Sequence, residues 1–338
     1  MKRNAIWGLL AGLLIVCMLF AWRGLGPVAE LFAAGGWALL GVCLFAPFEQ
    51  VMGAEAYRRL FAPRHRPAQP ATLLASWMGS AVNTLLPVAT IGGEVVKARV
   101  LVHWGAKAEP AVAAMVVDKT VQAVVVLAWG LVGIVALTLI SDEADVIAGA
   151  LAGAAGLAAG IGGFVWVQLK GGAGFMARAA GRARSGDWGG LIETADDVDA
   201  EIRAAYGRPV AVAAGVAIRL ATRVVLVGEI ILAAHLMGHP IGLVEAVMLK
   251  ALVVGIRGIG FAVPGGWGVQ EGGYIAIGAL IGLPPDLMLA VSLATRVREI
   301  LPNIPLLFYW QFHEGRRHWR RSRAETADRR DVSGAPPS

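Results

Sequence analysis

The stretch Phe261-Ala-Val-Pro-Gly-Gly-Trp-Gly-Val-Gln-Glu-Gly-Gly-Tyr274 decides how this chain must fold. It is a glycine-rich break between two apolar runs, and Glu271 is its only charged residue. Irregular backbone of this kind can lie at the depth of a bilayer only where protein or a water-filled cavity satisfies its amide and carbonyl groups. If the flanking runs are membrane segments, the break is therefore a candidate binding site.

An earlier stretch repeats this layout. Glu94 lies seven positions after Pro87. Glu271 lies seven positions after Pro264. Interrupted segments in corresponding positions of two halves are the sequence pointer to the binding site of a transporter. A glycine pair accompanies each proline and acid, Gly92-Gly93 in the first stretch and Gly265-Gly266 in the second.

The composition is that of an integral membrane protein. Of the 338 residues 57% are hydrophobic and only 16% are charged, and the mean hydropathy is +0.64. Several apolar runs reach the roughly 20 residues that a helix needs to cross the hydrocarbon core, whereas a β-barrel would show short alternating segments. We therefore expect an all-α polytopic membrane helix bundle. Its positive charge is concentrated in loops and the tail, which indicates membrane topology rather than nucleic-acid binding.

The first half is predicted to contain two spans, a re-entrant hairpin and a third span. Basic residues between positions 58 and 66 place that loop in the cytoplasm, and the N-terminus with it. The acidic turn at residues 141–145 is then periplasmic. The expected elements are Ala5–Trp22, Leu31–Phe48, a hairpin of Ala71–Leu86 with Gly92–Arg99, and Val121–Ile140.

The second half is predicted to repeat this order. A cytoplasmic insert at residues 170–208 contains an amphipathic pattern that we expect to pack on the bundle as a helix, with Leu191, Val198, Ile202 and Tyr206 on its apolar face. Glycines at positions 149, 153, 156 and 160 predict close approach of another helix to the fourth span. The expected elements are spans at Val146–Leu169 and Val210–Met237, a hairpin at Leu243–Leu283, and a last span at Leu287–Phe312.

These elements predict one membrane domain, residues 1–312, with inverted halves at about 5–140 and 145–312 and hairpins that open to opposite sides. Three full crossings after residue 243 would also bring the chain from the periplasmic side back to a cytoplasmic C-terminus. Residues 313–338 form a basic tail, which we expect to be cytoplasmic and to anchor on anionic lipid. The predicted location is a bacterial inner membrane, with both termini in the cytoplasm.

Charged residues recur where the spans should be most apolar. Arg219 and Arg223 lie four positions apart, on one face of the fifth span. Each costs roughly 2.5–3.5 kcal/mol at the bilayer midplane, so a partner from another segment, water or an anionic ligand must compensate it. In the last span Arg296 can pair with Glu299 three positions later.

At predicted membrane depth, basic residues outnumber acidic ones by nine to five. An electropositive cavity would suit a phosphate-bearing headgroup, because guanidinium groups bind phosphate bidentately. Two alternatives stay open: the ions pair with one another and fasten the bundle, or Glu94 and Glu271 accept hydrogen bonds from their own broken segments. The residues counted are Lys97, Arg99, Lys119, Arg219, Arg223, Lys250, Arg257, Arg296 and Arg298 against Glu94, Asp118, Glu229, Glu271 and Glu299.

No catalytic, metal or cofactor motif accompanies these charges. The sequence has no HExxH, GxSxG, P-loop or dinucleotide fingerprint. His235 and His239 have no third ligand nearby, and both cysteines lie inside apolar runs. We therefore expect no metal and no cofactor.

The broken segments carry a family resemblance. Asn83-Thr-Leu-Leu-Pro87 with Gly92-Gly-Glu94, and Pro264-Gly-Gly-Trp-Gly-Val-Gln-Glu271 followed by Arg296 and Pro302, resemble the membrane domain of the lysylphosphatidylglycerol synthase family, also described as flippase-like. The resemblance covers about residues 5–312 and is greatest for the stand-alone branch associated with hopanoid biosynthesis. Trp267 and Lys97 depart from the pattern, where a smaller aliphatic residue and an arginine are expected.

The resemblance implies lipid handling and argues against aminoacyl transfer. The predicted function is a non-enzymatic lipid transporter for a phospholipid or hopanoid-type lipid, with lipid-biosynthesis enzymes as further partners. The alternatives are an intramembrane transferase or accessory subunit with Glu94 or Glu271 as general base, and a structural scaffold. Predicted substrate-binding residues are Glu94, Lys97, Arg219, Arg223, Arg257, Glu271, Arg296 and Glu299. Predicted backbone contributors are Asn83, Pro87, Gly92, Gly93, Pro264, Gly265, Gly266 and Gly268.

Overall fold

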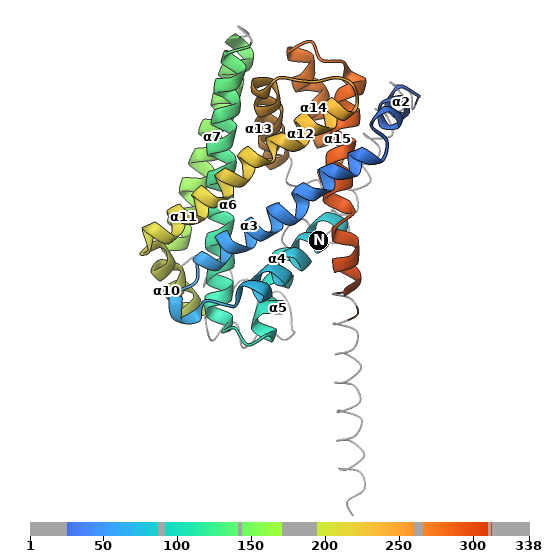
Figure 1. The fold of residues 1–338 in the computed structure, drawn as a ribbon. Helices are drawn as coiled ribbons and strands as arrows, with labels where there is room; N and C mark the ends of the chain where they lie inside the picture. Colours follow the sequence, from blue (N-terminus) through green and yellow to red (C-terminus); the bar gives the residue numbers. More distant parts are fainter. Residues whose placement is uncertain are drawn as a thin grey trace, which may run out of the picture.

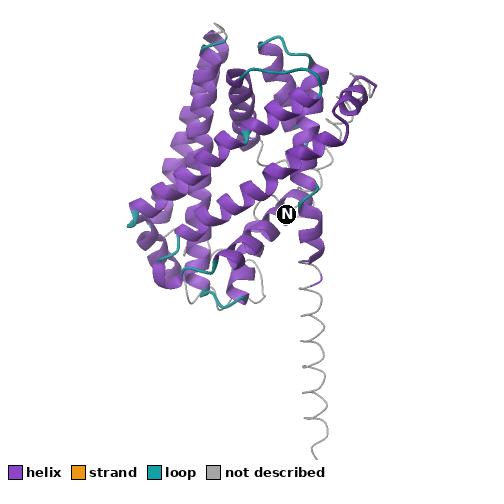
Figure 2. Cartoon of the chain, viewed as in Figure 1, coloured by secondary structure: helices purple, strands orange, loops and turns teal. Residues whose placement is uncertain are grey.

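The computed structural model describes residues 26–86, 92–140, 144–170, 195–259, 266–309 and 312, and every regular element in this part is helical (Figure 2). The predicted all-α bundle is therefore confirmed. The first predicted span, Pro87, Pro264, Gly265 and the basic tail lie outside the described residues.

The first half is built from one long helical run, a helical hairpin and a long helix. A continuous run from Gly26 to Arg59 contains a 3-10 segment between two α-helices. The elements are α2 (Gly26–Gly35), η1 (Gly36–Leu44), α3 (Phe45–Arg59), η2 (Pro63–His65), α4 (Gln69–Leu85), α5 (Gly92–His103) and α6 (Ala108–Thr138).

The second half has the same kinds of element. Its long run is interrupted at Leu226, which joins α11 to α12. The elements are α7 (Ala144–Leu169), α10 (Ala195–Tyr206), α11 (Pro209–Val225), α12 (Val227–Leu236), α13 (Leu243–Ile259), α14 (Val269–Leu280) and α15 (Pro285–Ile300).

Four helical runs in the described part are long and apolar enough to cross a membrane, by length and composition. Together with the helical hairpins they make the chain a polytopic membrane protein. These runs are Gly26–Arg59, Ala108–Thr138, Ile147–Leu169 and Pro209–Leu236.

Two predicted span boundaries are wrong, because in both cases the helix is longer than predicted. The second span continues to Arg59 rather than ending at Phe48, and the third begins at Ala108 rather than at Val121. In both places the helix continues through polar residues that the apolar pattern had excluded. Those side chains contact other helices, as described below, so the helix need not end where the apolar run does.

The last predicted span is divided. Helix α15 ends at Ile300, Leu301 and Pro302 form a turn, and residues 303–309 are helical again. Proline has no N–H to donate and its ring clashes with the carbonyl of the preceding turn, so it breaks a helix. The interruption therefore has a local cause, and the structure does not present residues 287–312 as one straight helix.

The two hairpins lie at opposite ends of the bundle. Figure 1 shows α4–α5 toward the bottom and α13–α14 toward the top, with α3 and α11–α12 crossing obliquely between them. Helix α4 packs on α5 and on α3, while α13 packs on α14 and on α12. The second arm of each hairpin then packs on the next helix, α5 on α6 and α14 on α15. The same packing order thus recurs in both halves, and the α3–α11 and α6–α13 contacts join them.

The amphipathic segment of the insert packs on the bundle as predicted. Helix α10 contacts α6, α7 and α11 and buries Val198 and Ile202. At its end the Tyr206 hydroxyl lies 3.0 Å from Thr120 Oγ1 and 2.8 Å from Gln168 Oε1. Burial raises the pKa of the Tyr206 phenol, so the hydroxyl keeps its proton for these bonds near neutral pH. Leu191, also predicted for this face, lies outside the described residues.

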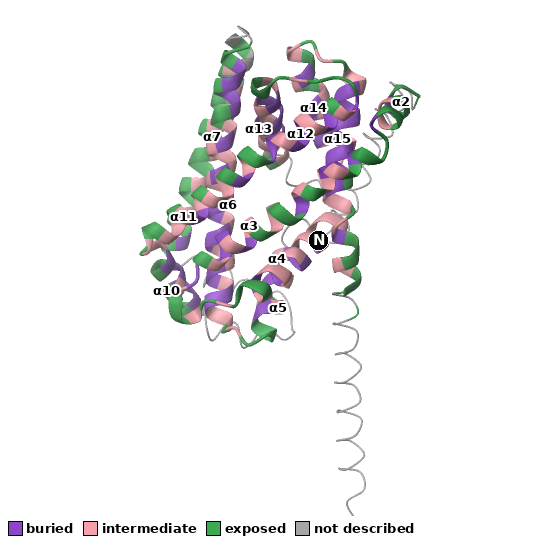
Figure 3. Ribbon diagram, in the orientation of Figure 1, coloured by how far each residue is buried: buried purple, intermediate pink, exposed green. Residues whose placement is uncertain are grey.

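The glycine ladder of α7 does not receive a helix in the described part of the chain. A Cβ added at Gly149, Gly153, Gly156 or Gly160 would meet no other atom within 4 Å. Figure 3 shows the outer side of α7 exposed along its length, whereas buried residues gather where α6, α13 and α15 face their neighbours. The predicted close approach is therefore not found among the described residues.

Candidate functional site

A polar cavity of about 350 Å³ lies between the two halves. Seven helices line it: α3, α4, α5, α6, α11, α13 and α15. Both hairpins contribute, so the predicted hollow between the two halves has a counterpart in the structure. Its lining includes six basic and three acidic side chains: Lys97, Lys119, Arg219, Arg223, Arg257 and Arg298, with Glu49, Glu94 and Glu299.

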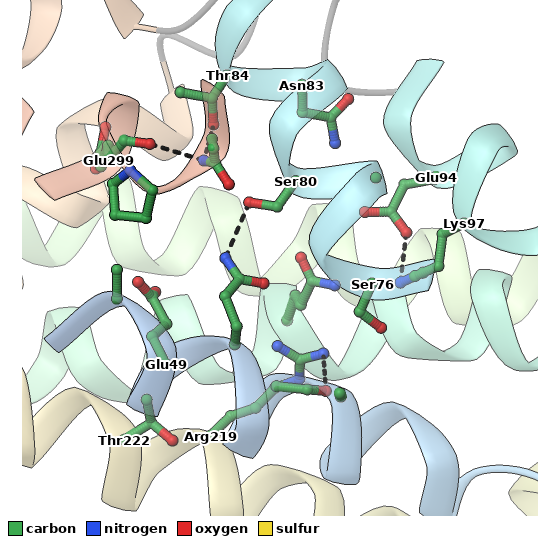
Figure 4. Close-up of a pocket in the computed structure, with 18 of the residues that line it drawn as sticks. Glu49, Ser76, Ser80, Asn83, Thr84, Glu94, Lys97, Arg219, Thr222 and Glu299 are labelled. Carbon is green, nitrogen blue, oxygen red and sulfur yellow. Dashed lines mark hydrogen bonds and ion pairs between the residues drawn. The ribbon is translucent and has the colours of Figure 1, made fainter. Parts of the chain in front are cut away.

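One wall of the cavity is neutral and polar. Ser76, Ser80, Asn83 and Thr84 recur at helical spacing and so share one face of α4. In Figure 4 these side chains surround the opening above α3, and the Gln50 amide donates a 3.1 Å hydrogen bond to the Ser80 hydroxyl. This wall offers hydroxyl and amide groups to a ligand without adding charge.

The first hairpin holds an ion-pair cluster beside the cavity. Glu94 on α5 contacts the ammonium groups of Lys97 at 2.6 Å and Lys119 at 2.7 Å. Lys97 also lies 3.0 Å from the buried Asp118, which in turn lies 2.6 Å from the Arg219 guanidinium. Arg219 therefore has the partner from another segment that its position in the fifth span required.

The second hairpin holds a corresponding cluster. The Glu271 carboxylate accepts a 2.7 Å hydrogen bond from the Gly268 amide and pairs with Arg296 at 2.8 Å. Arg296 also donates to the Gly266 carbonyl at 2.7 Å and lies 3.4 Å from Glu299, as its i, i+3 spacing predicted. Glu271 thus satisfies the broken segment to which it belongs, which was one of the open alternatives.

The two clusters share a pattern. In each, the acid that follows the break pairs with a base on the next helix, Glu94 with Lys119 and Glu271 with Arg296. The second pair is the more enclosed: neither Glu271 nor Arg296 lines the cavity, and the Arg296 guanidinium stacks 4.8 Å from the centre of the Trp267 ring. The unexpected tryptophan therefore covers this arginine, and a cation–π contact adds to the ion pair.

The backbone of the first break is held by close packing. The Gly93 amide donates a 2.8 Å hydrogen bond to Asn83 Oδ1, so Asn83 satisfies an amide at the start of α5. A Cβ on Gly93 would lie 2.0 Å from the Gly79 carbonyl oxygen, which only glycine allows. In the second break Gly266 and Gly268 have φ of 62° and 77°, in the left-handed region.

A third set of charges connects the cavity to the interior. Arg298 on α15 contacts Glu49 on α3 and lies 2.7 Å from Glu229 on α12. Glu229 also pairs with Lys250 on α13. Because Glu229 is fully buried between two cations, this set ties α12, α13 and α15 together.

Arg223 differs from these residues. It lines the cavity, and among the described residues no ion pair or hydrogen bond is formed by its side chain. The charged side chains that act on it most strongly are Glu49 and three further arginines, Arg219, Arg257 and Arg298, all of which line the same cavity. Four guanidinium groups from α11, α13 and α15 therefore converge on one space.

The charge pattern predicted from sequence is corrected in part. Arg223 is the exception among the nine basic residues that had been counted: seven of the others have a carboxylate within 4 Å in the described structure, and Arg99 also has an interaction partner. The seven are Lys97, Lys119, Arg219, Lys250, Arg257, Arg296 and Arg298. The excess of four cations also falls, because Glu49 is an acid that the count did not include.

The predicted site residues fall into three groups. Glu94, Lys97, Arg219, Arg223, Arg257, Glu299 and Asn83 line the cavity. Glu271, Arg296, Gly92, Gly93, Gly266 and Gly268 belong to the neighbouring breaks and their ion pairs. Pro87, Pro264 and Gly265 lie outside the described residues.

Sequence reasoning missed several lining residues. Glu49 and Gln50 follow directly after the apolar run that ends at Phe48, so they were read as lying outside the span. The α4 wall did carry a signal, since Ser76, Ser80 and Thr84 recur every four residues within an apolar run. No group of three or more His, Cys, Asp or Glu side chains in the described residues is arranged to hold a metal ion.

A comparison with protein families gives one match. The family model described as "Lysylphosphatidylglycerol synthase TM region" covers residues 6–305, which includes both breaks, all the lining helices and α15. No curated protein and no solved structure matches the chain significantly.

Proposed function

Since the chain belongs to the lysylphosphatidylglycerol synthase transmembrane-region family, we propose that it moves the polar headgroup of an anionic lipid across the bilayer through the cavity between its two hairpins. The family gives the chain a membrane-lipid-related role. The cavity supports the finer proposal, because it lies between the halves and is both polar and basic.

The unpaired guanidinium of Arg223 carries the proposal. An arginine at membrane depth costs roughly 2.5–3.5 kcal/mol unless something compensates it. Three neighbouring arginines add repulsion to that cost. A phosphate group placed in the cavity would supply two or more acceptor oxygens and the missing negative charge, a geometry that guanidinium groups bind well.

The rest of the lining suits the remainder of a headgroup. Opposite the arginines, the serine, threonine and asparagine side chains of α4 present neutral donors and acceptors. Such a wall can bind the hydroxyl groups of an esterified alcohol while the lipid tails stay in the hydrocarbon. Because the cavity is basic, a phospholipid headgroup fits it better than the neutral or cationic headgroup of many hopanoids.

The transferase alternative receives less support. Glu271 is buried away from the cavity and already holds Gly268 and Arg296. Glu94 lines the cavity, but two lysines stabilise its ionised form, which opposes proton abstraction. We therefore favour transport, with the bacterial inner membrane and cytoplasmic termini as the proposed setting and lipid-biosynthesis enzymes as suppliers of the substrate.

Reconstitution tests the proposal. Full-length protein is placed in liposomes with fluorescently labelled phosphatidylglycerol, and accessibility of the label to dithionite is followed with time. We expect wild-type protein to expose inner-leaflet label faster than empty liposomes, and Arg223→Gln to lose most of this activity. Labelled phosphatidylcholine should move more slowly, because its headgroup has no net charge.

Arg203→Gln is the matched control, because Arg203 is an exposed arginine on α10, outside the cavity. It removes the same charge and should leave transport unchanged. Wild-type liposomes that behave like empty ones would contradict the proposal, as would equal transport by wild type and Arg223→Gln.

A further inference from the structure

Glu49 is an acid in the middle of a basic site. Its carboxylate extends from α3 into the cavity (Figure 4), and the side chain is 31% exposed there. An acid in this position should weaken the binding of an anionic ligand by repulsion. A function that depends on such a ligand therefore needs a reason for its presence.

We infer that Glu49 is an internal counter-ion, which occupies the headgroup site of Arg223 and Arg298 in the empty protein and is displaced by the anionic headgroup. The inference rests on the proposed function and assigns it a specificity-determining residue. The carboxylates that neutralise Arg298 and Arg223 differ in whether an anionic ligand could replace them.

Arg298 can release Glu49 at little cost. Its Nη1 contacts Glu49, while its Nε lies 2.7 Å from Glu229. Glu229 is fully buried and does not line the cavity, so its ion pair with Arg298 is kept when a ligand binds in the cavity. Glu299 also lies 3.6 Å from Arg298 Nη2 and lines the cavity, but it is held more closely by Arg257. Of the two carboxylates in closest contact with Arg298, only that of Glu49 lines the cavity and can be reached by a ligand.

Arg223 depends more strongly on the same carboxylate. Glu49 is the nearby acid that offsets its charge, against repulsion from three arginines. Attraction from Arg298, which Glu49 contacts, and from Arg223 also acts on Glu49 itself, and all three side chains line the cavity. An anion that binds Arg298 from the cavity would therefore compete with Glu49 for the same guanidinium.

A phosphodiester is a suitable replacement for a carboxylate. Both carry one negative charge and present two acceptor oxygens, so the exchange conserves the charge of the site and the type of hydrogen bond made by the arginines. A transport site must bind its ligand well enough to admit it and weakly enough to release it. A carboxylate that returns when the headgroup leaves would satisfy both requirements.

The other acids of the cavity are poorly placed for this role. Glu94 is held by two lysines. Glu299 is held by Arg257 at 2.7 Å and by Arg296 at 3.4 Å. Displacing either would separate ion pairs that connect a hairpin to the following helix, whereas displacing Glu49 leaves Arg298 paired.

Binding measurements on the full-length protein in detergent test the inference. Isothermal titration with dihexanoylphosphatidylglycerol should show about tenfold tighter binding by Glu49→Gln than by wild type, and Glu49→Asp should resemble wild type because it keeps the charge. Affinity for dihexanoylphosphatidylcholine should change much less. In the liposome assay Glu49→Gln should also transport labelled phosphatidylglycerol more slowly, because release is impaired.

The outcomes separate this inference from the proposed function. Equal or weaker phosphatidylglycerol binding by both Glu49→Gln and Glu49→Ala, while Arg223→Gln still abolishes it, would overturn the counter-ion role alone. Absence of wild-type binding, or an unaffected Arg223→Gln, would reject the headgroup site itself. Inorganic phosphate that binds wild type as tightly as the lipid would point to a soluble anion, and tighter phosphate binding by Glu49→Gln would then keep the counter-ion role without lipid transport.

Discussion

Replacing Gly133 by alanine should loosen the contact between the two halves. Gly133 lies on α6 where α13 packs against it, and an added Cβ would lie 2.7 Å from Ala251 Cβ and 3.1 Å from Leu252 Cδ2. Carbon atoms in contact prefer separations of about 3.5–4.0 Å, so the helices must move apart. Gly130 lies one turn earlier on the same helix and has no atom within 4 Å of an added Cβ.

Comparing the two variants isolates the effect of overpacking on the free energy of unfolding. Alanine gains up to about 1 kcal/mol over glycine within a helix, and this gain applies to both positions. Overpacking of a close contact costs about 1–3 kcal/mol, and it applies to Gly133 alone. We therefore expect the free energy of unfolding of Gly133→Ala to be about 1–3 kcal/mol lower than that of Gly130→Ala.

Unfolding by sodium dodecyl sulfate in mixed micelles, followed by intrinsic fluorescence, measures this difference. Gly133→Ala should unfold at a lower detergent fraction than Gly130→Ala, and it should also transport lipid more slowly, since α6 and α13 join the halves that border the cavity. Equal unfolding curves for the two variants, or a more stable Gly133→Ala, would refute the reasoning.

Two further predictions concern buried polar contacts. Glu229→Gln should lower the free energy of unfolding by about 3–5 kcal/mol, because it leaves the buried Lys250 with an uncompensated charge, whereas Arg298 keeps Glu49. Adding Lys250→Met should recover part of the loss in the same micelle assay, and full additivity of the two changes would contradict the pairing. Asn83→Ala should cost about 0.5–2 kcal/mol by leaving the Gly93 amide without its acceptor. Asn83→Asp keeps an acceptor oxygen and should unfold closer to wild type; a loss as large as that of Asn83→Ala would argue against the cap.

The fold class and the two breaks could be predicted from the sequence because their causes are local. Hydrophobic length determines which runs can cross a bilayer. Glycine-rich breaks after Pro87 and before Glu271 cannot continue a lipid-exposed helix. The family assignment was equally accessible, since most of the residues on which the resemblance rests lie in or beside these breaks, and the family model covers residues 6–305. Span ends were less predictable, as the helix that continues past Phe48 shows.

Only the tertiary structure decided which charges are paired. Arg219 meets Asp118, which is 101 positions away, and Arg298 meets Glu49, which is 249 positions away. A local hydropathy pattern does not encode which helices face one another. It therefore cannot distinguish an arginine that is paired with a carboxylate from one that is not.

The sequence by itself therefore determined a helical membrane protein with two interrupted hairpins and costly charges, because length, hydrophobicity and glycine and proline chemistry act over a few turns of chain. The packing of α3, α11 and α15 decided the rest. It enclosed Arg296 beneath Trp267 and left Arg223 facing the cavity with Glu49 as its nearby acid. Charge compensation is a property of neighbours in space, and those neighbours exist only in the folded bundle.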